Sequence, residues 1–133
     1  MTDINEAMIF AAGFGKRMYP LSTKVPKPLL KVNGKPIISY IIEDLINLNF
    51  KNIVINTHHL SERFHNELKP YSRTIKIVFE EEILDTGGGF LNAIKRNYFS
   101  NLKSPKVLIN GDVLWKKTVN SPIKNILRNW NEE

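Results

Sequence analysis

The fold is decided by one stretch, Ala7-Met8-Ile9-Phe10-Ala11-Ala12-Gly13-Phe14-Gly15. Its apolar part, residues 7–12, predicts a short buried strand that ends in a Gly-x-Gly turn. Because Gly13 and Gly15 carry no side chain, backbone N–H groups at the turn can come close to a ligand. Lys16 and Arg17 follow directly and add positive charge. The combination is suited to binding a triphosphate.

Positive charge is concentrated just after this turn. Between Glu6 and Glu43 the chain has no acidic residue and six basic ones: Lys16, Arg17, Lys24, Lys27, Lys31 and Lys35. Pro26 and Pro28 stiffen the backbone on both sides of Lys27. The net charge of the whole chain is also +6, so the remainder is balanced. A local excess favours a small polyanion over a nucleic acid, whose binders spread basic and aromatic residues over a surface.

Two common phosphate-binding loops do not fit the turn. Residues 13–18 lack the third glycine of the dinucleotide-binding motif, and no helix-forming run follows them directly. A P-loop needs four residues between its glycines and then Lys-Ser or Lys-Thr, which are absent here. For Gly13-Phe14-Gly15 taken alone, an ordinary turn with solvated lysines is the alternative.

Hydrophobic periodicity predicts alternating strands and helices along the chain. We expect strands over residues 7–12, 52–56, 74–80 and 106–110, and helices over residues 36–47 and 89–99. A further helix is expected to be capped by Ser61 and to bury Phe64 and Leu68. The last helix is expected to start at Ser121-Pro122 and to turn these side chains inward: Ile123, Ile126, Leu127 and Trp130.

This order of elements predicts an α/β fold with a mainly parallel sheet and helices on both faces. In such sheets ligands collect beyond the carboxyl ends of the strands. Asp112 follows the buried strand 106–110 on a glycine turn, and is therefore the best candidate for a metal ligand. Mg²⁺ accepts a few carboxylate oxygens and otherwise keeps water and phosphate oxygens.

Three motifs, in this order, resemble the sugar-1-phosphate nucleotidyltransferases, or NDP-sugar pyrophosphorylases. They are Ala11-Ala12-Gly13-Phe14-Gly15-Lys16-Arg17-Met18-Tyr19-Pro20-Leu21 with Pro26-Lys27-Pro28-Leu29, then Glu80-Glu81-Glu82-Ile83-Leu84-Asp85-Thr86-Gly87-Gly88-Gly89, then Asn110-Gly111-Asp112-Val113-Leu114-Trp115. The Thr-Gly-Gly-Gly and Asn-Gly-Asp-Val sequences are most similar to the branch that includes N-acetylmuramate-1-phosphate uridylyltransferase. The similarity runs from about Ala7 to the end of the chain.

The resemblance implies a Rossmann-like domain that transfers a nucleotidyl group from a nucleoside triphosphate, with UTP favoured, to a sugar 1-phosphate. The products would be an NDP-sugar and pyrophosphate, and Mg²⁺ the cofactor. The implied catalytic cations are Arg17 and Lys27, with Asn110 at the sugar and Asp112 at the metal. The implied nucleotide-binding residues are Ala11, Ala12, Gly13, Gly15, Lys16, Thr86, Gly87 and Gly88.

Several of these residues have a plain structural interpretation. Residues 86–89 can form a flexible glycine loop before a helix, and Asp112 can be an ordinary turn aspartate. The acidic run 80–82 predicts a solvated strand end and not a catalytic cluster. The histidines match no zinc-binding spacing, so we expect no metal there, and their role stays open: His58, His59 and His65.

The same resemblance implies a second metal-binding aspartate and a wall of the sugar pocket far downstream of Glu133. Residues 1–133 are then the N-terminal nucleotide-binding part of one domain, with its C-terminal part missing and weak or no activity alone. The chain would be a fragment, a shortened gene product or a half completed by another chain. The alternatives are a non-catalytic or split nucleotide-binding subunit, a guanylyltransferase acting on mannose 1-phosphate and, more distantly, an RNA-binding module.

Composition limits the remaining classes. The chain has no cysteine, which excludes disulfides and thiolate metal sites. The polar start, residues 1–6, has no signal-peptide core, and no apolar run reaches membrane-spanning length. We therefore expect a cytoplasmic protein without a membrane partner. An unpaired sheet edge would favour self-association or pairing with a complementing chain.

Overall fold

A four-stranded parallel sheet forms the centre of the computed structural model, which describes residues 4–115 and 121–130. Its strand order is β5-β4-β1-β6. The strands are β1 (Glu6–Phe10), β4 (Asn52–Thr57), β5 (Ile75–Phe79) and β6 (Lys106–Asn110). The register pairs Met8 with both Val54 and Leu108. The predicted parallel sheet is confirmed, and β6 has the predicted bounds.

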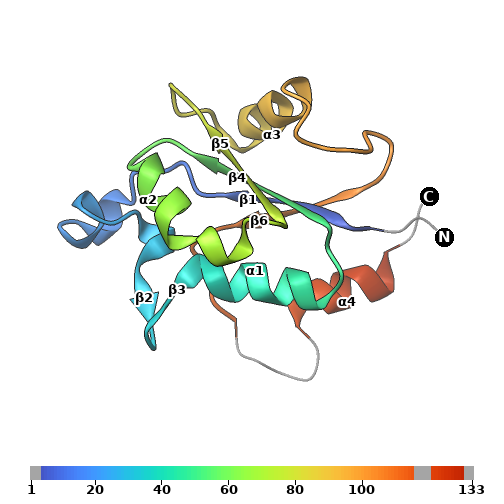
Figure 1. Cartoon of the computed structure of the whole chain (residues 1–133), viewed down its shortest axis with the longest axis horizontal. Helices are drawn as coiled ribbons and strands as arrows, with labels where there is room; N and C mark the ends of the chain where they lie inside the picture. The colour runs from blue at the N-terminus through green and yellow to red at the C-terminus, as the bar shows by residue number, and fades with distance from the viewer. Residues whose placement is uncertain (1–3, 116–120, 131–133) are drawn as a thin grey trace.

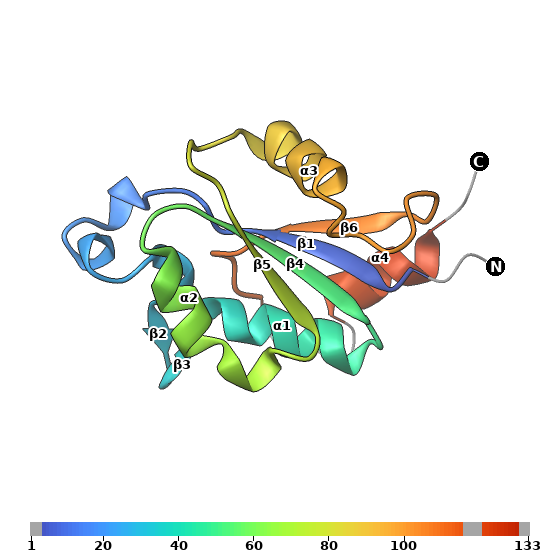
Figure 2. The ribbon, with the colours of Figure 1, turned by 45° about the horizontal axis from the view of Figure 1, so that its top comes forward.

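Helices cover both faces of this sheet, as predicted (Figure 1). Three lie on one face, α1 (Ile37–Asn47), α2 (Ser61–Glu67) and α4 (Pro122–Asn129), and α3 (Thr86–Lys95) lies on the other (Figure 2). Alternate residues of β1 point to opposite faces, so Ile9 packs in the larger core beside α1 and Met8 in the smaller core beside α3. Burial on both faces explains why β1 and β4 are continuously apolar.

The helix α1 follows a short hairpin that was not expected. β2 (Lys31–Val32) pairs antiparallel with β3 (Lys35–Pro36) through Asn33-Gly34. Both turn residues have positive φ, 52° and 77°, as an Asn-Gly hairpin turn requires. The buried stripe of α1 is the one that helical spacing predicts: Ile38, Ile41, Ile42 and Leu45. None of the described helices is both long and apolar enough to cross a bilayer.

Two helix starts differ from their predicted positions. α3 begins at Thr86 and not at Gly89, because Asp85 caps it: Oδ1 accepts a hydrogen bond from the Gly88 N–H at 2.6 Å. Ser61 is the first residue of α2 and not its cap, and its hydroxyl is hydrogen-bonded to Thr57 Oγ1 at 2.7 Å. The predicted burial of Phe64 and Leu68 is confirmed.

The helix α4 has a narrower buried face than predicted. Ser121 caps it by accepting a hydrogen bond from the Lys124 N–H at 3.1 Å. Ile123 is buried and Leu127 is partly buried against the larger core. The prediction that Ile126 and Trp130 also point inward is wrong, since they are 55% and 48% exposed. Only the Ile123 and Leu127 stripe, one turn apart, faces the sheet.

Candidate functional site

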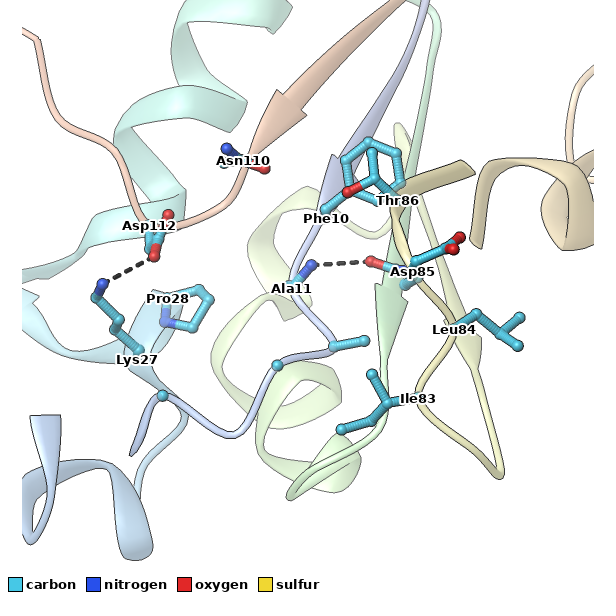
Figure 3. A pocket seen from close by; sticks show the side chains of 14 residues that line it. Phe10, Ala11, Lys27, Pro28, Ile83, Leu84, Asp85, Thr86, Asn110 and Asp112 are labelled. Carbon is cyan, nitrogen blue, oxygen red and sulfur yellow. Dashed lines mark hydrogen bonds and ion pairs between the residues drawn. The ribbon is translucent and has the colours of Figure 1, made fainter. Parts of the chain in front are cut away.

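A pocket of about 460 Å³ opens at the carboxyl end of the sheet (Figure 3). One wall is formed by the chain after β1 and by the segment around Lys27. The opposite wall is formed by the segment between β5 and α3, and Asp112, in the chain after β6, lies beside Lys27 (Figure 3). The lining residues are Phe10, Ala11, Ala12, Gly13, Gly15, Lys27, Pro28, Asn56, Ile83, Leu84, Asp85, Thr86, Asn110 and Asp112. Parts of all three sequence motifs therefore meet in one cavity.

Most of the residues singled out in the sequence line this pocket. They are Ala11, Ala12, Gly13, Gly15, Lys27, Thr86, Asn110 and Asp112. Four others do not line it: Lys16, Arg17, Gly87 and Gly88. Lys16 and Arg17 lie exposed on a short 3-10 helix, Lys16–Met18, just beyond the glycine turn. The tip of the first motif is thus held away from the cavity in this structure.

The cation and the carboxylate at the pocket contact each other. Lys27 Nζ lies 2.8 Å from Asp112 Oδ2. A dashed line marks this ion pair in Figure 3. Lys27 starts a 3-10 helix, Lys27–Leu29, which is anchored by the buried Leu29. Asp112 lies two residues beyond the end of β6. The side chains are 29% and 37% exposed, so water and ligands can reach the pair.

Glycines set this geometry at two points. Gly15 has φ of 65°, and a Cβ there would lie 3.0 Å from the Cβ of Lys27 and 3.1 Å from that of Ser22. The Ser22 hydroxyl donates to the Gly15 carbonyl at 2.5 Å. At Gly111 a Cβ would lie 3.0 Å from the carbonyl oxygen of Phe10. A side chain at position 15 would be strained by the positive φ, and at both positions it would press on the neighbouring chain that positions Lys27 or Asp112.

The two histidines after β4 contact different segments: His59 is hydrogen-bonded to the loop of the first motif, and His58 to the residue after β5. His59 Nε2 donates to the Ser22 carbonyl at 3.0 Å, and His58 Nδ1 donates to the Glu80 carbonyl at 2.7 Å. The Phe14 ring contacts both, with its centroid 5.4 Å from each imidazole. Within residues 4–115 and 121–130, no group of three or more acidic or histidine side chains is arranged to hold a metal ion.

One pocket residue and its buried partner were missed or misjudged in the sequence. Asn56, one residue before the end of β4, accepts a hydrogen bond from the Ala11 N–H at 2.8 Å through Oδ1. Its Nδ2 donates to Glu80 Oε2 at 3.1 Å. Glu80 is only 3% exposed, so the predicted solvated strand end is wrong for this residue, although Glu81 and Glu82 are exposed. The signal for Asn56 was a polar residue inside an apolar strand.

Known proteins resemble this chain in sequence and in fold. A family described as "Nucleotidyl transferase" matches residues 6–132. The N-acetylmuramate alpha-1-phosphate uridylyltransferase of Neisseria meningitidis serogroup B is 38% identical over 113 residues, which are 82% of this chain and 47% of that protein. The mannose-1-phosphate guanylyltransferase catalytic subunit beta of Danio rerio is 28% identical over 113 residues, 82% of this chain and 31% of that protein.

A solved structure also resembles this chain in fold. HddC from Yersinia pseudotuberculosis, in complex with GMP-PN, superposes with a TM-score of 0.67 at 26% identity. The match covers 82% of this chain and 48% of that chain. The chain therefore spans about half, or less, of the length of these three proteins.

Proposed function

Because this chain belongs to the nucleotidyl transferase family, we propose that it binds a nucleoside triphosphate in this pocket for transfer to a sugar 1-phosphate. One observation carries the proposal: the Gly13 to Gly15 turn, Lys27 and Asp112 line the same cavity as Thr86. Residues 1–133 would be the N-terminal, nucleotide-binding part of such a domain, acting in the cytoplasm. The activity of the whole domain belongs to this proposal.

In the proposed reaction, an oxygen of the sugar 1-phosphate attacks the α-phosphorus of the triphosphate. The bond from that phosphorus to the oxygen bridging the α- and β-phosphates breaks, and this oxygen leaves with the electron pair as part of pyrophosphate. The attacking oxygen already carries negative charge, so no side chain has to remove a proton. The protein contributes orientation and neutralisation of charge.

The residues of the pocket divide these tasks. Lys27 would pair with the α-phosphate or the sugar phosphate, and backbone N–H groups at Gly13 and Gly15 would approach the phosphates. Arg17, with Lys16, would neutralise charge that develops on pyrophosphate once the loop closes on the ligand. On the opposite wall Thr86, with the glycines after it, would meet the base and ribose. Asn110 would contact the sugar.

Asp112 is the residue that we propose as the Mg²⁺ ligand. Its carboxylate lines the pocket beside the amide of Asn110, and both offer the oxygen donors that Mg²⁺ prefers. A single carboxylate fits a cation that takes most other ligands from phosphate oxygens and water. When bound, such a cation neutralises phosphate charge and fixes the phosphate geometry.

Calorimetric titration with UTP and Mg²⁺ tests the binding step. Lys27→Ala should lower the affinity by roughly 10- to 150-fold, the equivalent of about 1.5–3 kcal/mol for a hydrogen bond to a charged group. Lys31→Ala is the matched control, because Lys31 is exposed in β2 and does not line the pocket. Equal affinities for wild type and Lys27→Ala would contradict the proposal.

The base preference separates the two transfer reactions. We propose UTP, on the resemblance of residues 86–89 and on the identity to the Neisseria meningitidis enzyme. The likeness to the Danio rerio protein favours a second candidate, guanylyl transfer to mannose 1-phosphate. Thermal shifts with UTP, dTTP, CTP, GTP and ATP at equal Mg²⁺ decide between them, and a clear preference for GTP selects the second.

Turnover and assembly are separate measurements. Pyrophosphate release with a panel of sugar 1-phosphates should be weak for the 133-residue protein, since Asp112 would be its single metal carboxylate. Nucleotide binding without release, also in a longer gene product, would favour a non-catalytic subunit. The strand β6 is an outer strand of the described sheet, and such edges pair with other chains. Light scattering would then show self-association.

A further inference from the structure

We propose that Asn56 and Glu80 are positioning residues that fix the two walls of the pocket relative to each other. Neither is needed for the proposed chemistry, and the inference rests on the proposed function only in taking the ligand to be a nucleoside triphosphate. The physical basis is a chain of two buried hydrogen bonds that runs from Ala11 on one wall to Glu80 at the base of the other.

The first link fixes the wall that carries the glycine turn. Ala11 is the first residue after β1, and its N–H donates to Asn56 Oδ1 at 2.8 Å. Three of the next residues, Ala12, Gly13 and Gly15, line the pocket. A shift of the Ala11 backbone would therefore be passed on to the turn that is proposed to meet the phosphates.

The second link fixes the opposite wall. Asn56 Nδ2 donates to Glu80 Oε2 at 3.1 Å, and Glu80 is the first residue after β5. The Glu80 backbone is held as well, because its N–H donates to the Thr57 carbonyl at 2.8 Å and its carbonyl accepts from His58. The segment that follows Glu80 supplies the pocket residues Ile83 to Thr86.

Burial makes this arrangement specific. Asn56 and Glu80 are 2% and 3% exposed, so water does not replace a lost partner. A flipped Asn56 amide would bring its NH₂ group against the Ala11 N–H, and two donors cannot bond each other. Only one orientation of the Asn56 amide allows both hydrogen bonds, and it is the one observed.

Helix α3 is packed onto the same pair. A Cβ on Gly89 would lie 2.9 Å from Asn56 Nδ2 and 3.2 Å from Glu80 Oε2. Glycine at this position therefore allows α3 to approach the pair closely. Because Thr86 begins α3, the position of the helix on the pair also sets where Thr86 stands in the pocket.

The decisive experiment exchanges the donor and acceptor of the second link. Asn56→Asp keeps the acceptor for Ala11 but removes the donor and places two carboxylates face to face. Adding Glu80→Gln to this variant restores an N–H donor, now on the other residue. Glu80→Gln alone keeps an acceptor for Asn56. The second carboxylate oxygen, Oε1, has no hydrogen-bond partner among the described residues, so no known contact of it is lost.

Two readouts are taken on folded protein near neutral pH. UTP affinity with Mg²⁺ should fall roughly tenfold or more in Asn56→Asp and return to within about threefold of Glu80→Gln in the double variant. Amide hydrogen exchange at Ala11 is measured by NMR without ligand. It should accelerate in the single variant, because repulsion from Glu80 pushes the new carboxylate away from the Ala11 N–H, and slow again in the double variant.

The matched control lies at the other end of the same strand. Asn52, in β4, also donates from Nδ2 to a buried glutamate, Glu6 Oε2, at 2.7 Å, but far from the pocket. Asn52→Asp should destabilise the fold in a similar way and leave UTP affinity and Ala11 exchange unchanged. If Asn56→Asp does not fold, Gly89→Ala crowds the pair without removing it, and it should still weaken UTP binding.

The outcomes separate the two proposals. An unchanged Ala11 exchange rate in Asn56→Asp, no recovery in the double variant, or an equal loss of affinity in Asn52→Asp would overturn the positioning role. Unchanged UTP affinity in Gly89→Ala would do the same where the first variant does not fold. If wild type binds none of the nucleotides but Ala11 exchange follows the expected pattern, the positioning role stands and the proposed function falls.

Discussion

Lys27 Nζ and Asp112 Oδ2 lie 2.8 Å apart, so the cation of the first motif and the carboxylate of the third neutralise each other in this structure. Both side chains are about one-third exposed, and ion pairs in such positions contribute only about 0–1 kcal/mol to stability. The pair can therefore open at small cost. Opening would free Lys27 for a phosphate and Asp112 for a cation at the same moment.

Asp112→Asn tests this exchange of partners. The variant should lose most of the gain in UTP affinity that Mg²⁺ gives to wild type, because the proposed metal carboxylate is gone. Without Mg²⁺ it should bind UTP at least as well as wild type, since Lys27 is no longer neutralised. Calorimetry in Mg²⁺ and in EDTA measures both. Glu43→Gln is the control, because Glu43 pairs with Lys35 at 2.7 Å outside this pocket. An unchanged Mg²⁺ effect in Asp112→Asn would contradict the metal assignment.

Arg17→Ala tests whether the exposed tip of the first motif reaches the outer phosphates. We expect UTP affinity to fall by about 1.5–3 kcal/mol, the contribution of a hydrogen bond to a charged group, while UMP affinity stays unchanged. The two nucleotides are compared by calorimetry, with Lys24→Ala as a control of equal charge. Equal losses for UTP and UMP would place Arg17 elsewhere, and no loss for either would remove it from the site.

Alanine at Gly87 and alanine at Gly89 should change the free energy of unfolding in opposite directions. Gly87→Ala meets only Asp85 Oδ1 at 3.8 Å, so it should stabilise α3 by up to about 0.5–1 kcal/mol through better helix propensity. Gly89→Ala would press on Asn56 and Glu80 and should destabilise by about 1–3 kcal/mol. Urea unfolding measures both free energies. A neutral or stabilising Gly89→Ala would show that α3 can move away from the pair.

The buried carboxylate of Glu6 should make the fold sensitive to acid. Burial by itself raises the pKa of Glu6, but hydrogen bonds from Asn52, Ser100 and Asn101 outweigh it and lower the pKa from 4.5 to about 2. Lys106 Nζ also lies 3.4 Å from Oε1. The unfolded state then binds the proton more readily than the folded state. The stabilisation is complete above the unfolded pKa of 4.5 and is lost as the pH falls toward 2.

Glu6→Gln measures this contribution. At neutral pH the variant should lose up to about 3 kcal/mol of unfolding free energy, and the difference from wild type should shrink as the pH falls through this window. Urea unfolding at several pH values gives both curves. Glu81→Gln is the control, since Glu81 is exposed and should show no such difference. A difference that does not change with pH would mean that Glu6 acts through packing and not through its charge.

The sequence was sufficient to predict the strands and to predict that the three motifs lie at one edge of the sheet. Apolar runs such as residues 106–110 are long enough to mark buried strands, and parallel strands bring their carboxyl ends to one edge. Gly15, Lys27 and Asp112 could therefore be expected in one place. The predicted start of α3, at Gly89, is three residues too late. Three consecutive glycines have poor helix propensity, but the Asp85 cap lets the helix begin at Thr86.

What the sequence by itself determined was the parallel sheet, the helices on its two faces and the side of the sheet where the ligand site lies. These follow from periodicity and turn residues, which act over a few positions along the chain. Only the tertiary structure decided that Glu80 is buried while its neighbour Glu81 is exposed. The reason is the close approach of Gly89 on α3 and the hydrogen bond from Asn56, and contacts between such distant residues leave no local pattern.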